Sequence, residues 1–294
     1  MLGCRARNYR TGYKYLWRTF TTLSKTLERA LKKNSWLTRE IDGLVLNQSP
    51  LLAAQPKLVH AFTTRLGGNS PSPVDNFNLG RHLDTDESRA DAAANRHKLC
   101  RALGLDPQRL AVPGQVHSAI VVVADDKNTY KEVDGIATDE RNRPVLLHFA
   151  DCVPVIIYDA KTHVLCIVHA GWRGTAGSIA KNGVQLMVDH FGSKPSDIVA
   201  AVGPAIGTCC YPTGDEVVTK LSATVSNIGD LIVSRDGVPH PDLKAVNAMQ
   251  LLESGVAEVD VTDVCTACQP ELFYSHRQSG GKTGRQGAIG SLVR

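Results

Sequence analysis

The chain contains two apolar, β-branched runs that are separated by a short polar turn. The runs occupy residues 153–158 and 164–168, and residues 159–163 lie between them. Continuous apolar runs of this length, bounded by turn residues, are typical of strands that are buried on both faces. If the turn folds them into an antiparallel pair, the entrance of the first strand lies beside the exit of the second.

The remaining apolar segments alternate between strand-like and helix-like patterns without a regular βαβ order or an internal repeat. The predicted strands are residues 58–63, 110–116, 119–124, 145–149, 198–202, 259–264, 273–277 and 286–293. Four helices are predicted. The first begins at Asp84 or Thr85 and ends at Leu103, and the others occupy residues 175–191, 215–221 and 243–252. This mixture predicts an α+β fold, a single-domain mixed α/β sandwich with mostly buried strands and helices packed outside.

Charge separates the first 40 residues from the rest of the chain. They carry ten Lys or Arg and two acids, whereas the other 254 residues carry 23 basic and 27 acidic side chains. We therefore expect a basic N-terminal extension, residues 1–40, and a catalytic domain, residues 41–294. The first 36 residues resemble an organellar transit peptide, although a basic tail or a misplaced start codon would look similar, and they should be dispensable for folding. The mildly acidic body argues against a nucleic-acid partner.

The eight cysteines do not have the spacing of a disulfide framework, which favours a reducing compartment. We expect a cytoplasmic protein, or an organellar one if the extension is a transit peptide. No apolar run approaches the length that spans a membrane. Cys265 and Cys268 form a single CxxC without a second pair, so a structural role is favoured over a redox or metal role. Cys209 and Cys210 are adjacent and cannot readily bridge each other.

Polar residues suited to a metal site lie at the ends of the predicted central strands. Asp151 and Cys152 precede the first strand, His169 follows the second, and His117 closes the segment before them. A thiolate beside imidazoles suits zinc or copper, and it also suits a nucleophile with its base. Three ligands with a fourth position open are typical of a catalytic zinc. The alternative is a buried cysteine and a histidine that bonds to backbone.

Several separated motifs occur in the same order as in a known family. They are QVH, ADCVP, HAGWRG, GPAIGTCCY and FYSHRQSGGKTGR. Over residues 58–294 the chain resembles the laccase-domain family, whose members are called polyphenol oxidases, purine nucleoside phosphorylases and peptidoglycan editing factors. It departs from the family at Pro212-Thr213, where members carry Glu-Val.

The resemblance implies a metal site, usually zinc, on His117, Cys152 and His169. It also implies that Arg65 and Asn78 lie at the rim of the active site and that Arg285 contacts the substrate. Arg173, at the expected start of a helix, is a candidate for phosphate binding, although it could instead pair with Asp151. Asp151 or a histidine that contacts the substrate ring would move protons.

Four functional hypotheses are consistent with these residues. The resemblance favours a zinc-dependent purine nucleoside phosphorylase, with adenosine, inosine or methylthioadenosine as substrates and perhaps adenosine deamination as well. A Cys/His or zinc hydrolase that edits peptidoglycan precursors is the main alternative. Copper polyphenol oxidation is disfavoured because none of the three methionines falls in the motifs. A metal-binding module without catalysis would not need cationic loops. The oligomeric state is not predicted.

Overall fold

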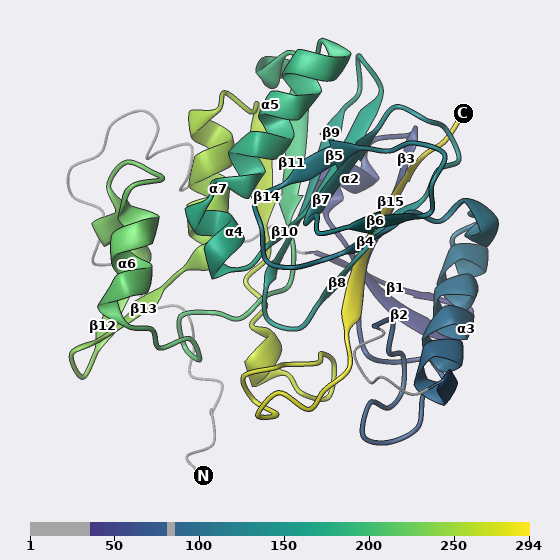
Figure 1. Cartoon of the computed structure of the whole chain (residues 1–294), viewed down its shortest axis with the longest axis horizontal. Coiled ribbons are helices and arrows are strands. Elements are labelled where there is room, and N and C mark those ends of the chain that lie inside the picture. Colours follow the sequence, from purple (N-terminus) through teal and green to yellow (C-terminus); the bar gives the residue numbers. More distant parts are fainter. Residues whose placement is uncertain (1–35, 81–85) are drawn as a thin grey trace.

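The computed structural model describes residues 36–80 and 86–294, and its core is a pair of facing β-sheets (Figure 1). The first sheet has the strand order β1 (Leu37–Ile41), β2 (Leu44–Gln48), β3 (Leu58–Thr63), β15 (Gln286–Leu292) and β8 (Val145–Phe149). The second has the order β14 (Glu258–Val261), β11 (Ile198–Val202), β9 (Val153–Asp159), β10 (Val164–Ala170), β7 (Gly135–Thr138) and β5 (Val121–Val123).

Helices cover the outer face of each sheet. The described helices are α2 (Pro50–Ala53), α3 (Asp86–Ala102), α4 (Trp172–Ala176), α5 (Ile179–Phe191), α6 (Asp215–Ser222) and α7 (Leu243–Glu253). Short 3-10 turns occupy η2 (Pro107–Arg109), η3 (Pro195–Asp197), η4 (Ile228–Leu231) and η5 (Thr266–Cys268). Figure 1 shows α4, α5 and α7 together on one side, and α3 on the other side beside β1 and β2. The predicted sandwich with outer helices is therefore confirmed.

The central hairpin shows why its apolar runs are continuous. β9 and β10 pair antiparallel, with His169 opposite Pro154 and Ala170 opposite Val153. On β9, Ile157 packs toward α5 and α7, while its neighbour Ile156 packs toward the first sheet. Because successive side chains of a strand point to opposite faces, a sheet covered on both faces needs apolar residues at every position.

Four predicted elements differ from the observed ones. The predicted strands at 110–116 and 119–124 shorten to β4 (Val112–Gly114) and β5. The predicted helix 175–191 is two helices, α4 and α5, because Ser178 adopts a left-handed conformation between them (φ 58°). No strand forms at 273–277. There the backbone of Tyr274 bonds to the side chain of Gln286, which replaces a neighbouring strand. The predicted start at Asp84 or Thr85 lies outside the described residues, and the described part of α3 begins at Asp86.

The described fold begins inside the predicted extension. Residues 1–35 lie outside the described part of the chain. Trp36 packs its ring 5.1 Å from that of Phe62, and its indole N–H donates to Asp260. β1 then pairs with β2 along its whole length. A deletion that ends at residue 36 therefore removes a packed side chain.

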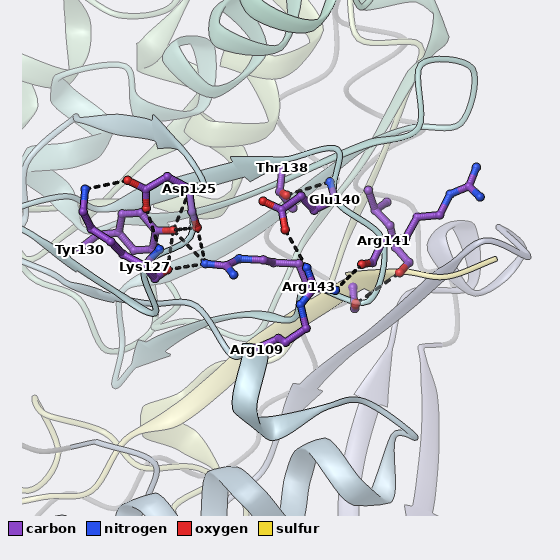
Figure 2. A network of polar contacts seen from close by, with 10 residues as sticks. Arg109, Asp125, Lys127, Tyr130, Thr138, Glu140, Arg141 and Arg143 are labelled. Atoms are coloured by element: carbon purple, nitrogen blue, oxygen red, sulfur yellow. Dashed lines mark hydrogen bonds and ion pairs between the residues drawn. The ribbon is translucent and has the colours of Figure 1, made fainter.

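Two small β-units complete the chain, β12 (Ile232–Arg235) with β13 (Val238–Pro241), and β4 with β6 (Thr129–Lys131). A polar network holds the loop before β6 in place (Figure 2). The buried guanidinium of Arg143 donates to the carbonyl oxygens of Asp125 and Lys127 and, over 3.2 Å, to the hydroxyl of Tyr130. Tyr130 belongs to β6, so this network fixes a strand that forms one wall of the site described next.

Candidate functional site

Chemically reactive side chains collect at one edge of the second sheet. β9 begins directly after Cys152, β7 begins directly after Asp134, and His169 is the last residue but one of β10. Since β10 runs antiparallel to both β9 and β7, these three strand ends meet at the same edge. His117 reaches this edge from the loop between β4 and β5. The potential ligand atoms of His117, Cys152 and His169 all lie within 4.8 Å of one another.

Asp134, which belongs to none of the motifs singled out in the sequence, anchors His117 and His169. Its carboxylate accepts backbone N–H bonds from Val116, His117 and Ser118, and a further bond from the Ser118 hydroxyl. The same carboxylate lies 2.8 Å from Nδ1 of His169. Binding of the backbone holds His117 in a left-handed conformation (φ 63°) that a non-glycine residue rarely adopts. The only sign of this role in the sequence is the position of Asp134 directly before Gly135, the first residue of β7.

The Asp134–His169 contact fixes the proton on the ring. A carboxylate at Nδ1 favours the tautomer that leaves Nε2 to face the cluster. Burial opposes the charge on Asp134, but its bonds to His169 and Ser118 outweigh this and lower its pKa to about 2. Asp134 is therefore an anion at neutral pH, and a carboxylate is the usual outer partner of a histidine that binds a metal.

Cys152 and His169 form a polarised pair. Burial disfavours a Cys152 thiolate, but the charge of His169 and hydrogen bonds from both histidines overcome it and lower the pKa of Cys152 to about 6. Burial likewise disfavours the imidazolium of His169, and the thiolate of Cys152 together with Asp134 raises its pKa to about 9. The sulfur atom is thus ready to act as a metal ligand or as a nucleophile.

Gly171 leaves the space that the cluster needs. A Cβ atom at this position would lie 3.0 Å from both Sγ of Cys152 and Cδ2 of His117. A side chain here would press against both residues and shift one of them, and glycine avoids this contact.

Asp151 holds loops together, and its carboxylate is fully engaged. One oxygen accepts from the Thr266 hydroxyl at 2.7 Å, and the other from the Ser275 hydroxyl and the backbone N–H of Arg277. These bonds tie the start of β9 to the C-terminal loop. Arg173, the alternative partner considered for Asp151, donates none of these three bonds. Its predicted role in proton transfer stays a prediction.

The three-ligand cluster lies in a cavity of about 920 Å³. Four arginines line it: Arg173 and Arg277, which are exposed, Arg285, which is partly buried, and Arg96, which is buried. Arg173 stacks over the ring of Trp172, with 4.4 Å between Cζ and the ring centroid. Arg285 donates to the carbonyl oxygens of Thr283 and Gly284, and its charge interacts with those of Cys152 and Asp151. Because α4 has only five residues, the cationic side chains rather than the helix terminus are the groups that favour an anion in this cavity.

Two residues that the resemblance placed at the rim have different surroundings. Arg65 does not line the cavity; its guanidinium bonds to the carbonyl oxygens of Asp75 and Pro270 and stacks on Tyr274. Asn78 is fully buried, and its side-chain oxygen accepts the backbone N–H of Arg285 at 2.9 Å. Asn78 therefore acts on the cavity indirectly, by placing Arg285. Gln115 likewise positions another residue of the cavity, because its side-chain amide exchanges two hydrogen bonds with the backbone of His148.

Comparison with known proteins agrees with the motifs. The family model described as multi-copper polyphenol oxidoreductase laccase matches residues 59–292. The purine nucleoside phosphorylase YlmD of Geobacillus stearothermophilus is 38% identical over 241 residues, 77% of this chain and 87% of its own length. YlmD of Bacillus subtilis, also called a purine nucleoside phosphorylase, is 35% identical over 243 residues, 78% and 86% of the two chains.

Solved structures give the same result. The crystal structure of YlmD from Geobacillus stearothermophilus superposes with a TM-score of 0.80 at 35% identity, over 87% of this chain and 98% of the other. A Bacillus licheniformis protein, YfiH, also gives 0.80 at 32% identity and the same coverage. No described helix has both the length and the apolar character needed to cross a bilayer. The chain belongs to the multi-copper polyphenol oxidoreductase laccase family.

Proposed function

We propose that the protein is a zinc-dependent purine nucleoside phosphorylase. The observation that carries the proposal is the joint placement of a two-histidine, one-cysteine cluster and four arginines in one cavity. A cavity of about 920 Å³ is large enough for a nucleoside and a phosphate ion together. The names of the relatives support the same reaction.

The cluster fits zinc. Zinc binds imidazole nitrogen at about 2.0–2.1 Å and thiolate at about 2.3 Å, so its ligand atoms lie roughly 3.5 Å apart, within the 4.8 Å limit found here. When bound, the ion supplies a Lewis acid that polarises an oxygen atom of its fourth ligand. The outer carboxylate of Asp134 is the partner that such a histidine ligand usually has.

Copper is the alternative metal, but the donor set favours zinc. A blue-copper site adds a weak axial methionine to two histidines and a cysteine. Among the described residues, Met187 and Met249 both belong to the hydrophobic core under α5 and α7, and neither lines the cavity.

In the proposed reaction, an oxygen of phosphate bonds to C1′ of the ribose as the bond from C1′ to the purine nitrogen breaks. The electron pair of that bond goes to the base, which takes up a proton, and ribose 1-phosphate is the other product. Arg173 and Arg285 orient the phosphate by charge-assisted bonds. His148 and His276 line the cavity outside the ligand set, so they are the histidines placed to protonate the departing base.

A Cys152–His169 hydrolase, including one that edits peptidoglycan precursors, is the second candidate. The observation in its favour is the proximity of the Cys152 sulfur atom to a ring nitrogen of His169, within 4.8 Å, which lowers the pKa of the Cys152 thiol to about 6. Such a hydrolase would attack through sulfur and would not need phosphate.

Product analysis with zinc-loaded protein separates these functions. We expect inosine and adenosine to be cleaved only when phosphate is added, with ribose 1-phosphate as product. Cleavage that gives ribose without phosphate would indicate hydrolysis, and conversion of adenosine to inosine would indicate an additional deaminase. If neither nucleoside is consumed, the phosphorylase proposal is wrong and the editing hydrolase becomes the leading candidate.

Arg285→Ala should raise the KM for phosphate by roughly 10- to 150-fold, with a smaller effect on the KM for nucleoside. The reason is that a hydrogen bond to a charged group contributes about 1.5–3 kcal/mol. Arg173→Lys should also weaken phosphate binding, because an ammonium lacks the planar fork of guanidinium. Arg235→Ala, on the exposed strand β12, is the control and should change neither KM. Equal increases in both KM values would place Arg285 at the nucleoside instead.

A further inference from the structure

Four cysteines that the catalytic site does not use lie together beside it. The sulfur atoms of Cys209, Cys210, Cys265 and Cys268 are all within 4.8 Å of one another. We propose that these four thiolates bind one structural zinc ion, in a second metal site that is separate from the cluster on His117, Cys152 and His169.

Strand order explains how distant cysteines meet. β11 and β14 are parallel neighbours, so their carboxyl ends lie at the same edge of the sheet. The loop after β11 carries Cys209-Cys210, and the loop after β14 carries Cys265 and Cys268. The loops are joined where Ala205 pairs with Cys265 and the N–H of Thr266 donates to the Ala205 carbonyl. The second cysteine pair that the single CxxC lacks in sequence is therefore supplied by the neighbouring strand.

Local turns direct the sulfur atoms inward. The N–H of Cys210 bonds to the carbonyl of Gly207, and the N–H of Cys268 bonds to that of Cys265. The second of these bonds closes η5, the one-turn helix inside the CxxC. Short turns of this kind let the two cysteines of a CxxC face one point, as they do in structural zinc sites.

The sulfur separations fit a shared ion. Four thiolates around zinc, each about 2.3 Å from it, lie roughly 3.8 Å from one another. Here Cys268 lies 3.3 Å from Cys209 and 3.4 Å from Cys210. Both distances are well beyond the roughly 2.0 Å of a disulfide bond.

The groups around the cysteines suit negative charge on sulfur. The backbone N–H of Gly207 donates to Sγ of Cys265 over 3.2 Å. The buried ammonium of Lys244 donates to the carbonyls of Thr262 and Val264, on the strand side of Cys265. Four thiolates and one zinc ion carry a net charge of minus two, and a nearby buried cation partly offsets it.

The position of the site gives it a use. Tyr211, which follows Cys210, lines the catalytic cavity, and Thr266, inside the CxxC, donates to Asp151 beside Cys152. A zinc ion here would join the two loops that form one wall of the cavity. Its ligand set is closed, with four protein thiolates, which is the arrangement of a structural site. The proposal does not depend on which reaction the cavity catalyses.

The metal content of full-length variants tests the proposal. His117→Ala combined with Cys152→Ala removes the first site, and we expect this double variant to retain about one zinc ion per chain by elemental analysis. Adding Cys268→Ser should abolish that zinc. Adding Cys100→Ala, which removes a buried thiol of α3 outside both clusters, should leave it unchanged. A folded double variant that binds no zinc from a zinc-buffered solution would overturn the proposal.

Cobalt gives a second measurement that does not require the Cys268 variant to fold. The double variant reconstituted with cobalt(II) should show thiolate-to-metal charge-transfer absorption and the intense visible bands of tetrahedral cobalt. Weak bands typical of octahedral oxygen ligation would contradict a four-thiolate site. Mass spectrometry without reductant is the last arm. A disulfide between Cys268 and Cys209 or Cys210 in freshly purified, zinc-free protein would assign these cysteines to redox chemistry and also overturn the proposal.

Discussion

Two clusters of soft ligands share one edge of the second sheet, but they differ in composition and in exposure. The first combines His117, Cys152 and His169, opens into a cavity, and is surrounded by arginines. The second has only cysteines, four of them, enclosed by two loops. An open ligand position next to anion-binding side chains suits catalysis, whereas a closed set of thiolates suits a structural role. Different strand ends at one edge of the sheet thus carry two kinds of cluster, according to the residues that their loops add.

The outer partners of the two clusters differ in sign. Asp134, an anion, supports the ligand His169, while Lys244, a cation, lies near the cysteines. A neutral imidazole ligand is made more basic by a carboxylate, and a set of thiolates is stabilised by an ammonium. The nearby charged group is therefore an anion beside imidazole in the first cluster and a cation beside thiols in the second.

The largest expected effect separates the clusters by function. Cys152→Ala should lower kcat/KM for nucleoside by more than about 100-fold, because even the loss of an outer partner typically costs 10- to 100-fold. Cys268→Ala should instead lower the melting temperature by at least about 5 °C, since each kcal/mol shifts Tm by roughly 2–4 °C in large domains. Kinetics and calorimetry on both variants test this. An equal loss of activity in the two would mean that the second cluster takes part in catalysis.

The next effect concerns the outer carboxylate. Asp134→Asn should weaken metal binding at the first cluster by roughly 10- to 100-fold, because the amide cannot act as an anionic acceptor for His169. Asp159→Asn is a matched control: Asp159 is also buried and also accepts backbone N–H groups, but in the turn between β9 and β10. Competition with a chromogenic chelator measures both. Unchanged zinc affinity in Asp134→Asn would show that His169 is positioned by packing alone.

The smallest effect uses pH to separate metal loss from sheet stability. Burial lowers the pKa of His60, on β3, from 6.5 to about 4. The unfolded chain therefore binds a proton that the folded chain excludes, and stability falls as pH drops from 6.5 towards 4, by up to about 3 kcal/mol. Neutral His60 accepts the backbone N–H of Ser49, so protonation also breaks this bond.

His60→Gln should reduce this acid sensitivity without changing zinc content at pH 7. His97→Gln, in α3, serves as the control and should behave like the unmodified protein. Melting temperatures at pH 7.5 and 5.5, with metal content measured at both, give the comparison. If His60→Gln loses stability with acid as steeply as the parent chain, the release of metal from the thiolates is the dominant acid effect.

The sequence by itself determined the central hairpin and the proximity of Cys152 to His169. Two apolar runs joined by a polar turn allow one pairing register, which places Cys152 near His169. Continuous apolar character at every position also required layers on both faces of that sheet. These features are local, or follow from one short turn, so their physical cause lies within about 20 residues of chain.

Only the tertiary structure decided which distant groups support them. Asp134 reaches His169 because β7 pairs with β10, and the sequence does not reveal that strand order. Asp151 could have met a guanidinium, but the packing of the C-terminal loop gave it hydroxyl and backbone donors. The four cysteines meet because β11 and β14 are parallel neighbours, although 58 residues separate Cys210 from Cys268. Contacts of this range depend on the order of strands in the sheet, which is set by packing of the whole core rather than by any one segment.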